Sequence, residues 1–159
     1  MAKRAWKRQK DWWIIGGLAS PEPATEAQGY IPFMTRTVLH TADAPAAIGP
    51  YSQAIKAEGT LLFMSGQIPL TPSGDLVTGD IKTQTEQVVA NMRAVLAEAG
   101  ATPANLVKTT IFLSSMDHFA AVNEVYGTLF EGEPPARSTV AVAGLPKGVD
   151  VEIEGIAVL

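Results

Sequence analysis

Residues 105–126 read "NLVKTTIFLSSMDHFAAVNEVY" and place a β-strand directly before an α-helix. The first half is rich in β-branched residues, which favour extended backbone. The second half carries apolar side chains at helical spacing, and Asp117 is expected to cap this helix. The apolar positions are Phe119, Val122, Val125, Tyr126 and Leu129. A strand followed by a one-sided helix is typical of a layered fold in which helices cover a sheet.

The same signals predict four further strands and one further helix. Asp80 and Gly100 bound the helix, as N-cap and as the glycine after its last turn. Two strands joined by a tight Glu-Gly-Thr connection precede it, and two more end the chain. These strands read "GPYSQAIKAEG" (49–59), "TLLFMSGQIP" (60–69), "ARSTVAVAGL" (136–145) and "VDVEIEGIAVL" (149–159). The order β-β-α-β-α-β-β predicts a single α+β domain without internal repeats.

The last strand shows that the predicted sheet has two apolar faces. Val151, Ile153 and Ala157 point to one side, while Glu152, Glu154, Ile156 and Val158 point to the other. The strand "LLFMSG" (61–66) is apolar on both sides. Two helices on one side of the sheet leave the other side uncovered, and monomers rarely expose large apolar patches. We therefore expect the second face to pack against copies of the same chain.

Composition excludes several classes of chemistry. The 159-residue chain has no cysteine, which rules out disulfides, thiolate metal ligands and a cysteine nucleophile. Its two histidines, His40 and His118, lack metal-ligand spacing, so no metal site is predicted. Residues 35–159 carry seven basic against thirteen acidic side chains, which argues against nucleic acid as a partner. No apolar run has the length of a membrane helix, so no membrane partner is expected either.

Residues 1–34 differ from the remainder in composition. They hold all three tryptophans and five basic against three acidic side chains, and "SPEPATEAQG" (20–29) reads as a proline-bearing linker. One interpretation is a targeting segment, with a basic start followed by the short apolar stretch "WWIIGGLA" (12–19). The other, which we favour, is a disordered leader or an upstream extension before Met34. The predicted domain covers residues 35–159.

Arg137 is the first candidate for a functional side chain. Pro134 and Pro135 restrict the backbone just before it, so its approach is fixed. A guanidinium held in this way offers two parallel donors to a small carboxylate. The alternative is an ordinary surface arginine paired with a carboxylate. Glu152 and Glu154 likewise leave two interpretations open, a solvent-facing acidic edge or an acid/base group beside the arginine.

Four other residues carry weaker signals. Tyr51 follows a Gly-Pro turn at the mouth of a strand, where a half-buried packing role is the usual one. Ser65 and Gly66 lie where a strand ends, and glycine there marks a bulge or a close approach to a ligand. Asn123 has Phe119 and Tyr126 one helical turn away, so it either supports the structure or helps to form a site.

Taken together, these stretches resemble the reactive intermediate deaminase family, RidA, also called the YjgF/translation-inhibitor family. The likeness runs from about Thr37 to Val158 and excludes the leader. The matching stretches are "APAAIGPYSQAI" (44–55), "LLFMSGQIPL" (61–70), "LVKTTIFLSSMDHFAAVNEVY" (106–126), "PPARSTVAV" (134–142) and "LPKGVDVEIEGIAV" (145–158). The resemblance implies a chorismate-mutase-like α+β fold, a mixed sheet with two helices on one face, and a cytoplasmic homotrimer with ligand clefts between subunits.

The resemblance also implies an activity and a site. The activity is hydrolysis of reactive 2-imino acids, 2-iminobutanoate and 2-iminopropanoate, to 2-oxo acids and ammonia without a cofactor. The family's ligand-binding arginine falls on Arg137, and its water-positioning acid falls on Glu152 rather than Glu154. Thr139 takes a site position where many members have cysteine. The family's other site positions fall on Tyr51, Ser65, Gly66 and Asn123.

Two alternatives to an imine hydrolase remain from the sequence. A binding or regulatory module would use the same arginine to sense 2-oxo acids without turnover, because fold does not fix function. A ribonuclease or translation inhibitor has been proposed for relatives, and the acidic charge of residues 35–159 argues against it.

Overall fold

The structure, a computed structural model, describes residues 34–159, and the expectations for the leader lie outside the described residues. Six strands and two α-helices make up this part of the chain, together with three short 3₁₀ turns. The elements are β1 (Thr35–Leu39), β2 (Ala54–Glu58), β3 (Leu61–Gln67), α1 (Ile81–Glu98), β4 (Leu106–Leu113), α2 (Phe119–Gly127), β5 (Ala136–Ala141) and β6 (Val151–Val158). The 3₁₀ turns are Pro103–Asn105, Met116–His118 and Pro146–Gly148.

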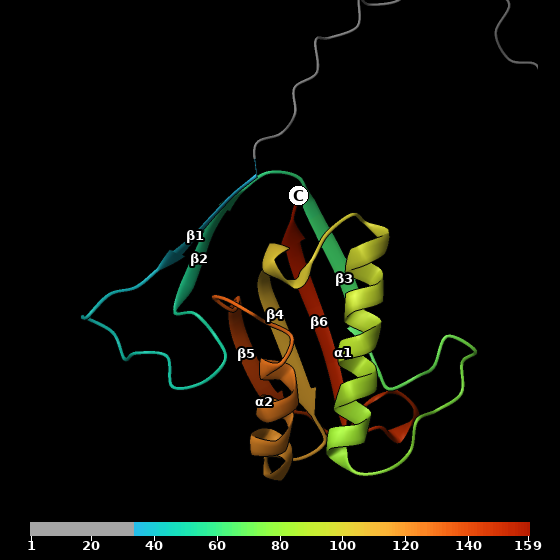
Figure 1. Ribbon diagram of the computed structural model, residues 1–159. Helices are drawn as coiled ribbons and strands as arrows, with labels where there is room; N and C mark the ends of the chain where they lie inside the picture. Colours follow the sequence, from blue (N-terminus) through green and yellow to red (C-terminus); the bar gives the residue numbers. More distant parts are fainter. Residues whose placement is uncertain (1–33) are drawn as a thin grey trace, which may run out of the picture. The chain divides into compact units, whose positions relative to one another are not determined.

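A four-stranded mixed sheet forms the centre of this fold. Its strand order is β3-β6-β4-β5, in which β4 and β5 run parallel and the other neighbours antiparallel. Helices α1 and α2 lie together over one face of the sheet (Figure 1). The predicted α+β class, the mixed sheet and the placement of both helices on one face are confirmed.

One strand was not predicted from the sequence. Strand β1 pairs antiparallel with β2 in a separate two-stranded ribbon. The connection from β2 to β3 is as short as predicted, yet it does not close a hairpin between them, because β3 pairs with β6. Gly59, at φ +146°, lies against the carbonyl of Leu159, where no Cβ fits. Thr60 and Leu159 exchange two backbone hydrogen bonds of 2.8 and 2.9 Å, which direct the chain into the sheet.

The two helices begin differently from one another. Asp80 caps α1 as predicted, because its Oδ1 accepts a hydrogen bond of 2.8 Å from the N–H of Thr83. Gly100 follows the helix at φ +69°, also as predicted. The prediction that Asp117 caps the second helix is wrong. The chain enters α2 through a 3₁₀ turn, and Ser115 caps this turn by accepting from the N–H of Asp117.

The core lies between the helices and the sheet, and the opposite face of the sheet is exposed. Residues of α1, β4, α2 and β6 supply the fully buried side chains, among them Val88, Met92, Leu96, Ile111, Ile153 and Tyr126. On the opposite face, Leu61, Phe63 and Val140 are 55%, 69% and 43% exposed. The predicted apolar second face is therefore present, and its packing against further copies stays a prediction.

Asp150 connects the end of β4 and the start of β6 to the first turns of helix α1. Its Oδ1 accepts a hydrogen bond of 2.7 Å from Ser114 Oγ, and its Oδ2 accepts one of 2.9 Å from Gln84 Nε2. These two bonds, first from Ser114 and then from Gln84, hold the pKa of the Asp150 carboxyl below its ordinary value of 3.8, and the nearby His118 adds to the effect. The ionised carboxylate therefore stabilises the junction of α1, β4 and β6.

Replacing Asp150 by asparagine is expected to flatten the acid dependence of folding. Because the folded pKa is depressed, the contribution of Asp150 is complete above the unfolded value and is lost as pH falls through the lower, folded value. At pH 7 the variant should lose about 1 kcal/mol of unfolding free energy. This is the contribution of a hydrogen bond to a charged group, reduced because the side chain is partly exposed to water. Urea unfolding of both proteins at pH 7 and at pH 3 measures this. A constant difference between them at both pH values would contradict the assignment.

Candidate functional site

Arg137 lies in a cage of aromatic rings on the helix-covered side of the sheet. Its Cζ is 5.4 Å from the ring centroid of Tyr51, 5.9 Å from that of Phe119 and 5.2 Å from that of Tyr126. Its Nη1 donates a hydrogen bond of 2.7 Å to Asn123 Oδ1. Ring faces attract a cation held within about 6 Å. The guanidinium is therefore fixed in orientation by four neighbours.

Among the described residues, no carboxylate forms an ion pair with the guanidinium of Arg137. Neither of the two ion pairs within residues 34–159 includes this side chain. Burial lowers the pKa of Arg137, and the two nearby tyrosines act in the opposite direction. A half-buried cation without a counter-ion carries a desolvation cost that an anionic ligand would offset. Among the described residues Arg137 is therefore not part of a structural ion pair, and its role in binding an anion stays a prediction.

The prolines before Arg137 hold a second segment beside it. The carbonyl of Pro135 accepts a hydrogen bond of 2.9 Å from the N–H of Ser52, and the carbonyl of Pro134 accepts one from Ser52 Oγ. These bonds fix the residue after Tyr51, so that the tyrosine ring reaches the guanidinium. The rigid approach predicted from the sequence thus positions both the arginine and one wall of its cage.

Tyr126 forms the buried floor of the cage. Its side chain is fully buried, and its hydroxyl shares a hydrogen bond of 2.7 Å with Thr109 Oγ1. Burial raises the pKa of Tyr126 to about 12. Thr109 is the cross-strand partner of Arg137 in the β4–β5 pair. The hydrogen bond therefore fixes the ring directly beneath the guanidinium.

Removing the Tyr126 hydroxyl alone should cost more than removing both partners of this bond. Tyr126→Phe leaves the buried Thr109 hydroxyl without a partner, which is expected to lower the unfolding free energy by about 1–2 kcal/mol. The double variant Tyr126→Phe/Thr109→Val should recover part of that loss, since no unpaired polar group remains. Chemical denaturation of wild type, both single variants and the double variant gives the coupling. Strictly additive losses would show that the hydroxyls do not depend on one another.

Thr139 lies on the same strand face as Arg137, two residues further along β5. Its Oγ1 is buried and has no hydrogen-bond partner among the described residues. Buried hydroxyls in native proteins are normally paired. We name Tyr51, Asn123, Arg137 and Thr139 the arginine cluster. Arg137 and Tyr51 also border a cavity of about 610 Å³ between β2, β4 and β5.

The other predicted residues lie elsewhere. Ser65, Gly66 and Glu152, which we name the glutamate cluster, come from β3 and β6. The pairing of β3 with β6 shifts register between Met64 and Gln67, so a bulge, one of the two interpretations of Gly66, is present. A Cβ added at Gly66 would collide with the carboxylate of Glu152. The carboxylate therefore rests against bare backbone at the bulge.

The two clusters are on opposite faces of the sheet. Arg137 pairs with the buried Thr109 and faces the helices, whereas Glu152 pairs with Phe112 and faces away from them. Side chains that alternate along a strand cannot cross to the other face. The residues predicted for one site are therefore not all brought together within one copy of the chain.

Phe119 and Tyr126 were assigned from the sequence only to the packing stripe of α2. The available signal was their spacing, since both lie one helical turn from Asn123.

Residues 34–159 contain no group of three or more histidine, aspartate or glutamate side chains placed to hold a metal ion. None of the helices described here combines the length and apolarity needed to cross a membrane.

Comparison with known proteins gives a consistent result over this part of the chain. The family model described as endoribonuclease L-PSP matches residues 41–159. Protein DfrA of Myxococcus xanthus is 51% identical over 127 residues, which cover 79% of this chain and 97% of that protein. The mouse 2-iminobutanoate/2-iminopropanoate deaminase is 48% identical over 124 residues, which cover 77% of this chain and 91% of the mouse protein.

The solved structures agree with the sequence comparison. A protein of the Rid family from Yersinia pestis, described as being of unknown function, superposes with a TM-score of 0.73 at 33% identity. The match covers 78% of this chain and 98% of that structure. The likeness extends over nearly the whole of these relatives.

Proposed function

This chain belongs to the endoribonuclease L-PSP family, also called the YjgF/RidA family, and on that premise we propose that it hydrolyses reactive 2-imino acids. The products are the 2-oxo acid and ammonia, and the proposed substrates are 2-iminobutanoate and 2-iminopropanoate. The name of the mouse relative, at 48% identity, supports this choice of substrate.

The observation that carries the proposal is the unpaired guanidinium of Arg137 in its aromatic cage. Asn123 occupies Nη1, and three rings fix the plane of the group. A 2-imino acid presents a planar carboxylate next to its reactive carbon. Arg137 binds that carboxylate through charge-assisted hydrogen bonds. Thr139 follows two residues along the same strand face, and we propose that it contacts the same ligand, although its hydroxyl is buried in a single copy.

The chemistry that remains after binding is addition of water and loss of ammonia. The protonated imine is already electrophilic at carbon, so water adds to C2 and gives a tetrahedral aminoalcohol. A proton moves from the added hydroxyl to the amino group, the C–N bond breaks, and the carbonyl forms. Glu152 accepts the proton of the attacking water and returns it to the departing nitrogen. Electrons and atoms balance without an external oxidant or reductant.

We further propose that Glu152 comes from a second copy of the chain. The exposed apolar face carries Leu61, Phe63 and Val140 as well as Glu152, so one contact would bury the apolar patch and deliver the carboxylate. The proposed assembly is the homotrimer of the family, with each site formed between the arginine cluster of one copy and the glutamate cluster of its neighbour.

A coupled assay tests the function directly. Threonine dehydratase generates 2-iminobutanoate in solution, and release of 2-oxobutanoate is followed with and without this protein. We expect addition of the protein to shorten the lag before 2-oxobutanoate appears. A trapping amine such as semicarbazide competes for the free imine and so increases the difference between the assays with and without the protein. An unchanged lag at equimolar protein would reject the hydrolase.

A second candidate is a binding module for 2-oxo acids. The specific observation in its favour is that the arginine cluster is complete within one copy, whereas Glu152 is on the opposite face. Such a module binds 2-oxobutanoate without accelerating imine hydrolysis. Calorimetric titration of 2-oxobutanoate beside the coupled assay separates the two, since only the hydrolase gives both signals.

A further inference from the structure

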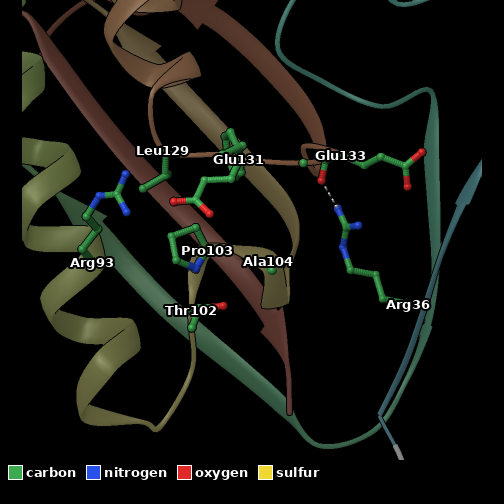
Figure 2. A pocket seen from close by; sticks show the side chains of 10 residues that line it. Arg36, Arg93, Thr102, Pro103, Ala104, Leu129, Glu131 and Glu133 are labelled. Atoms are coloured by element: carbon green, nitrogen blue, oxygen red, sulfur yellow. Dashed lines mark hydrogen bonds between the residues drawn. The ribbon is translucent and has the colours of Figure 1, made fainter.

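A second cavity, of about 470 Å³, holds two arginines that the proposed hydrolysis does not use. It lies between the 3₁₀ turn Pro103–Asn105 and the loop after α2 (Figure 2). Arg93 of α1 lines one side, and Arg36 of β1 lines the other. Arg137 is not among the lining residues. The cavity is therefore separate from the arginine cluster.

Both guanidinium groups are held by backbone carbonyls. Arg93 Nη2 donates a hydrogen bond of 2.8 Å to the carbonyl of Thr128. Arg36 donates from Nε to the carbonyl of Leu106 at 3.1 Å and from Nη2 to that of Glu133 at 2.9 Å. Carbonyl oxygens orient a guanidinium but leave its charge uncompensated. The two groups are thus positioned in advance, and neither is in an ion pair within the described residues.

Neither arginine has a carboxylate partner within residues 34–159. Burial lowers the pKa of Arg36, and the charge of Glu133 opposes this only in part. An anion bound beside Arg36 would offset that cost of burial. Arg93 is more exposed, and its remaining donors face the same cavity.

Two glutamates, Glu131 and Glu133, and an apolar wall also line the cavity. Glu131 extends between Arg93 and Pro103, while the side chain of Glu133 extends in the opposite direction (Figure 2). Pro103 and Phe130, both half-buried, supply apolar surface to the cavity. A simple anion such as phosphate would meet repulsion from Glu131, and a simple cation would meet it from two guanidinium groups. The complementary ligand carries two negative charges, one positive charge and a short apolar stem.

We propose that this cavity binds a free acidic α-amino acid. One carboxylate lies on Arg93 and the other on Arg36, and the ammonium group lies on Glu131. The methylene carbons between them pack on Pro103 and Phe130. The inference stands on these side chains alone and is independent of the proposed hydrolysis.

Calorimetric titration of the full chain tests the site, in the Arg137→Ala background so that the arginine cluster does not contribute. The probes are L-aspartate, L-glutamate and L-2-aminoadipate, which differ only in the distance between carboxylates. Glutarate lacks the ammonium group, and L-norvaline lacks the second carboxylate. We expect one of the three acidic amino acids to bind at least about tenfold tighter than glutarate and norvaline.

Substitutions at the two exposed positions assign the contacts. Arg93→Gln should weaken the best acidic amino acid about tenfold, and Glu131→Gln should weaken it while improving glutarate. Lys82→Gln, on the same helix as Arg93 but paired with Glu124, is the matched control and should change nothing. Arg36→Gln is used only where circular dichroism shows an intact fold.

Three outcomes would overturn the proposal. One is no binding of any acidic amino acid at millimolar concentration in the intact chain. Another is equal affinity for glutarate and glutamate, which would remove Glu131 from the site. The third is binding that Arg93→Gln leaves unchanged, which would place the ligand elsewhere on the protein.

Discussion

Replacement of Arg137 by alanine is expected to remove the acceleration of 2-iminobutanoate hydrolysis, with a loss of about 10³-fold or more in kcat/KM. The guanidinium is the group that would hold the substrate carboxylate, and among the described residues it is the cation found against these aromatic rings. Without it, the imine carbon is no longer fixed relative to the water. Initial rates in the coupled assay over a range of substrate concentrations give the change.

The same replacement should leave stability nearly unchanged. Arg137 forms no ion pair within the described residues, and its burial lowers its pKa, so alanine removes a cost along with the cation–π contacts. We expect a difference below about 1 kcal/mol in unfolding free energy. Arg93→Ala is the matched control, because it removes an arginine from outside the cluster and should retain full activity. Full activity in Arg137→Ala would remove the guanidinium from the mechanism.

Arg137→Lys separates charge from geometry. Lysine keeps the positive charge but offers no planar pair of donors, and its ammonium does not match the position held by Asn123. We expect it to recover at most a small part of the lost activity, with the deficit mainly in KM. Full rescue would show that charge alone suffices.

The sequence predicted those elements whose signals are local. The Asp80 cap and the Gly100 terminus of α1 are each set by a few neighbouring residues, and both are confirmed. Asp117 was chosen as a cap because aspartate favours that position, but Ser115 begins a 3₁₀ turn two residues earlier and takes the role. Strand β1 carries only five residues, "TRTVL", and has no alternation of its own. It is held by backbone pairing with β2, which a local pattern does not reveal.

In the candidate site, too, the features set by neighbouring residues could be predicted, and those set by packing between distant segments could not. The stiffness before Arg137 is readable from Pro134 and Pro135, and so is the choice of arginine as a carboxylate partner. The cage around it depends on how α2 packs over β5, which brings Phe119 and Tyr126 to the guanidinium. The face on which each side chain falls depends on register between strands. The alternation of side chains is regular within the strands of Arg137 and of Glu152. Only the pairing of both strands with β4 shows that these two side chains lie on opposite faces of the sheet.

Glu152→Gln is expected to lower kcat about 10²-fold while leaving the affinity for 2-oxobutanoate unchanged. Glutamine keeps the shape of the side chain at the Gly66 bulge but cannot accept the proton of the attacking water. Arg137 is untouched on the opposite face, so carboxylate binding persists. Steady-state kinetics and calorimetric titration of the same preparation separate the two effects. A parallel loss of binding would indicate that Glu152 contacts the carboxylate and not the water.

Mixing the two inactive variants should restore activity if each site is built from two copies. In a mixed assembly, an Arg137→Ala copy still supplies Glu152, and a Glu152→Gln copy still supplies Arg137. Random assortment of equal amounts makes about one quarter of the sites intact. Co-expression of the two variants with different tags, followed by purification on both tags, isolates the mixed species for the coupled assay.

The decisive control for that mixture is the double variant Arg137→Ala/Glu152→Gln, paired with Arg137→Ala. If the chain assembles as proposed, through the exposed face around Phe63, this mixture forms the same assembly but contains no Arg137 at all, so it should stay inactive. Because the two clusters lie on opposite faces, a site confined to one copy predicts no recovery from either mixture. Recovery in the first mixture alone requires that the guanidinium and the carboxylate meet across the contact between neighbouring chains. Absence of recovery, with mixed assemblies demonstrably formed, would leave Glu152 outside the site and favour the binding module.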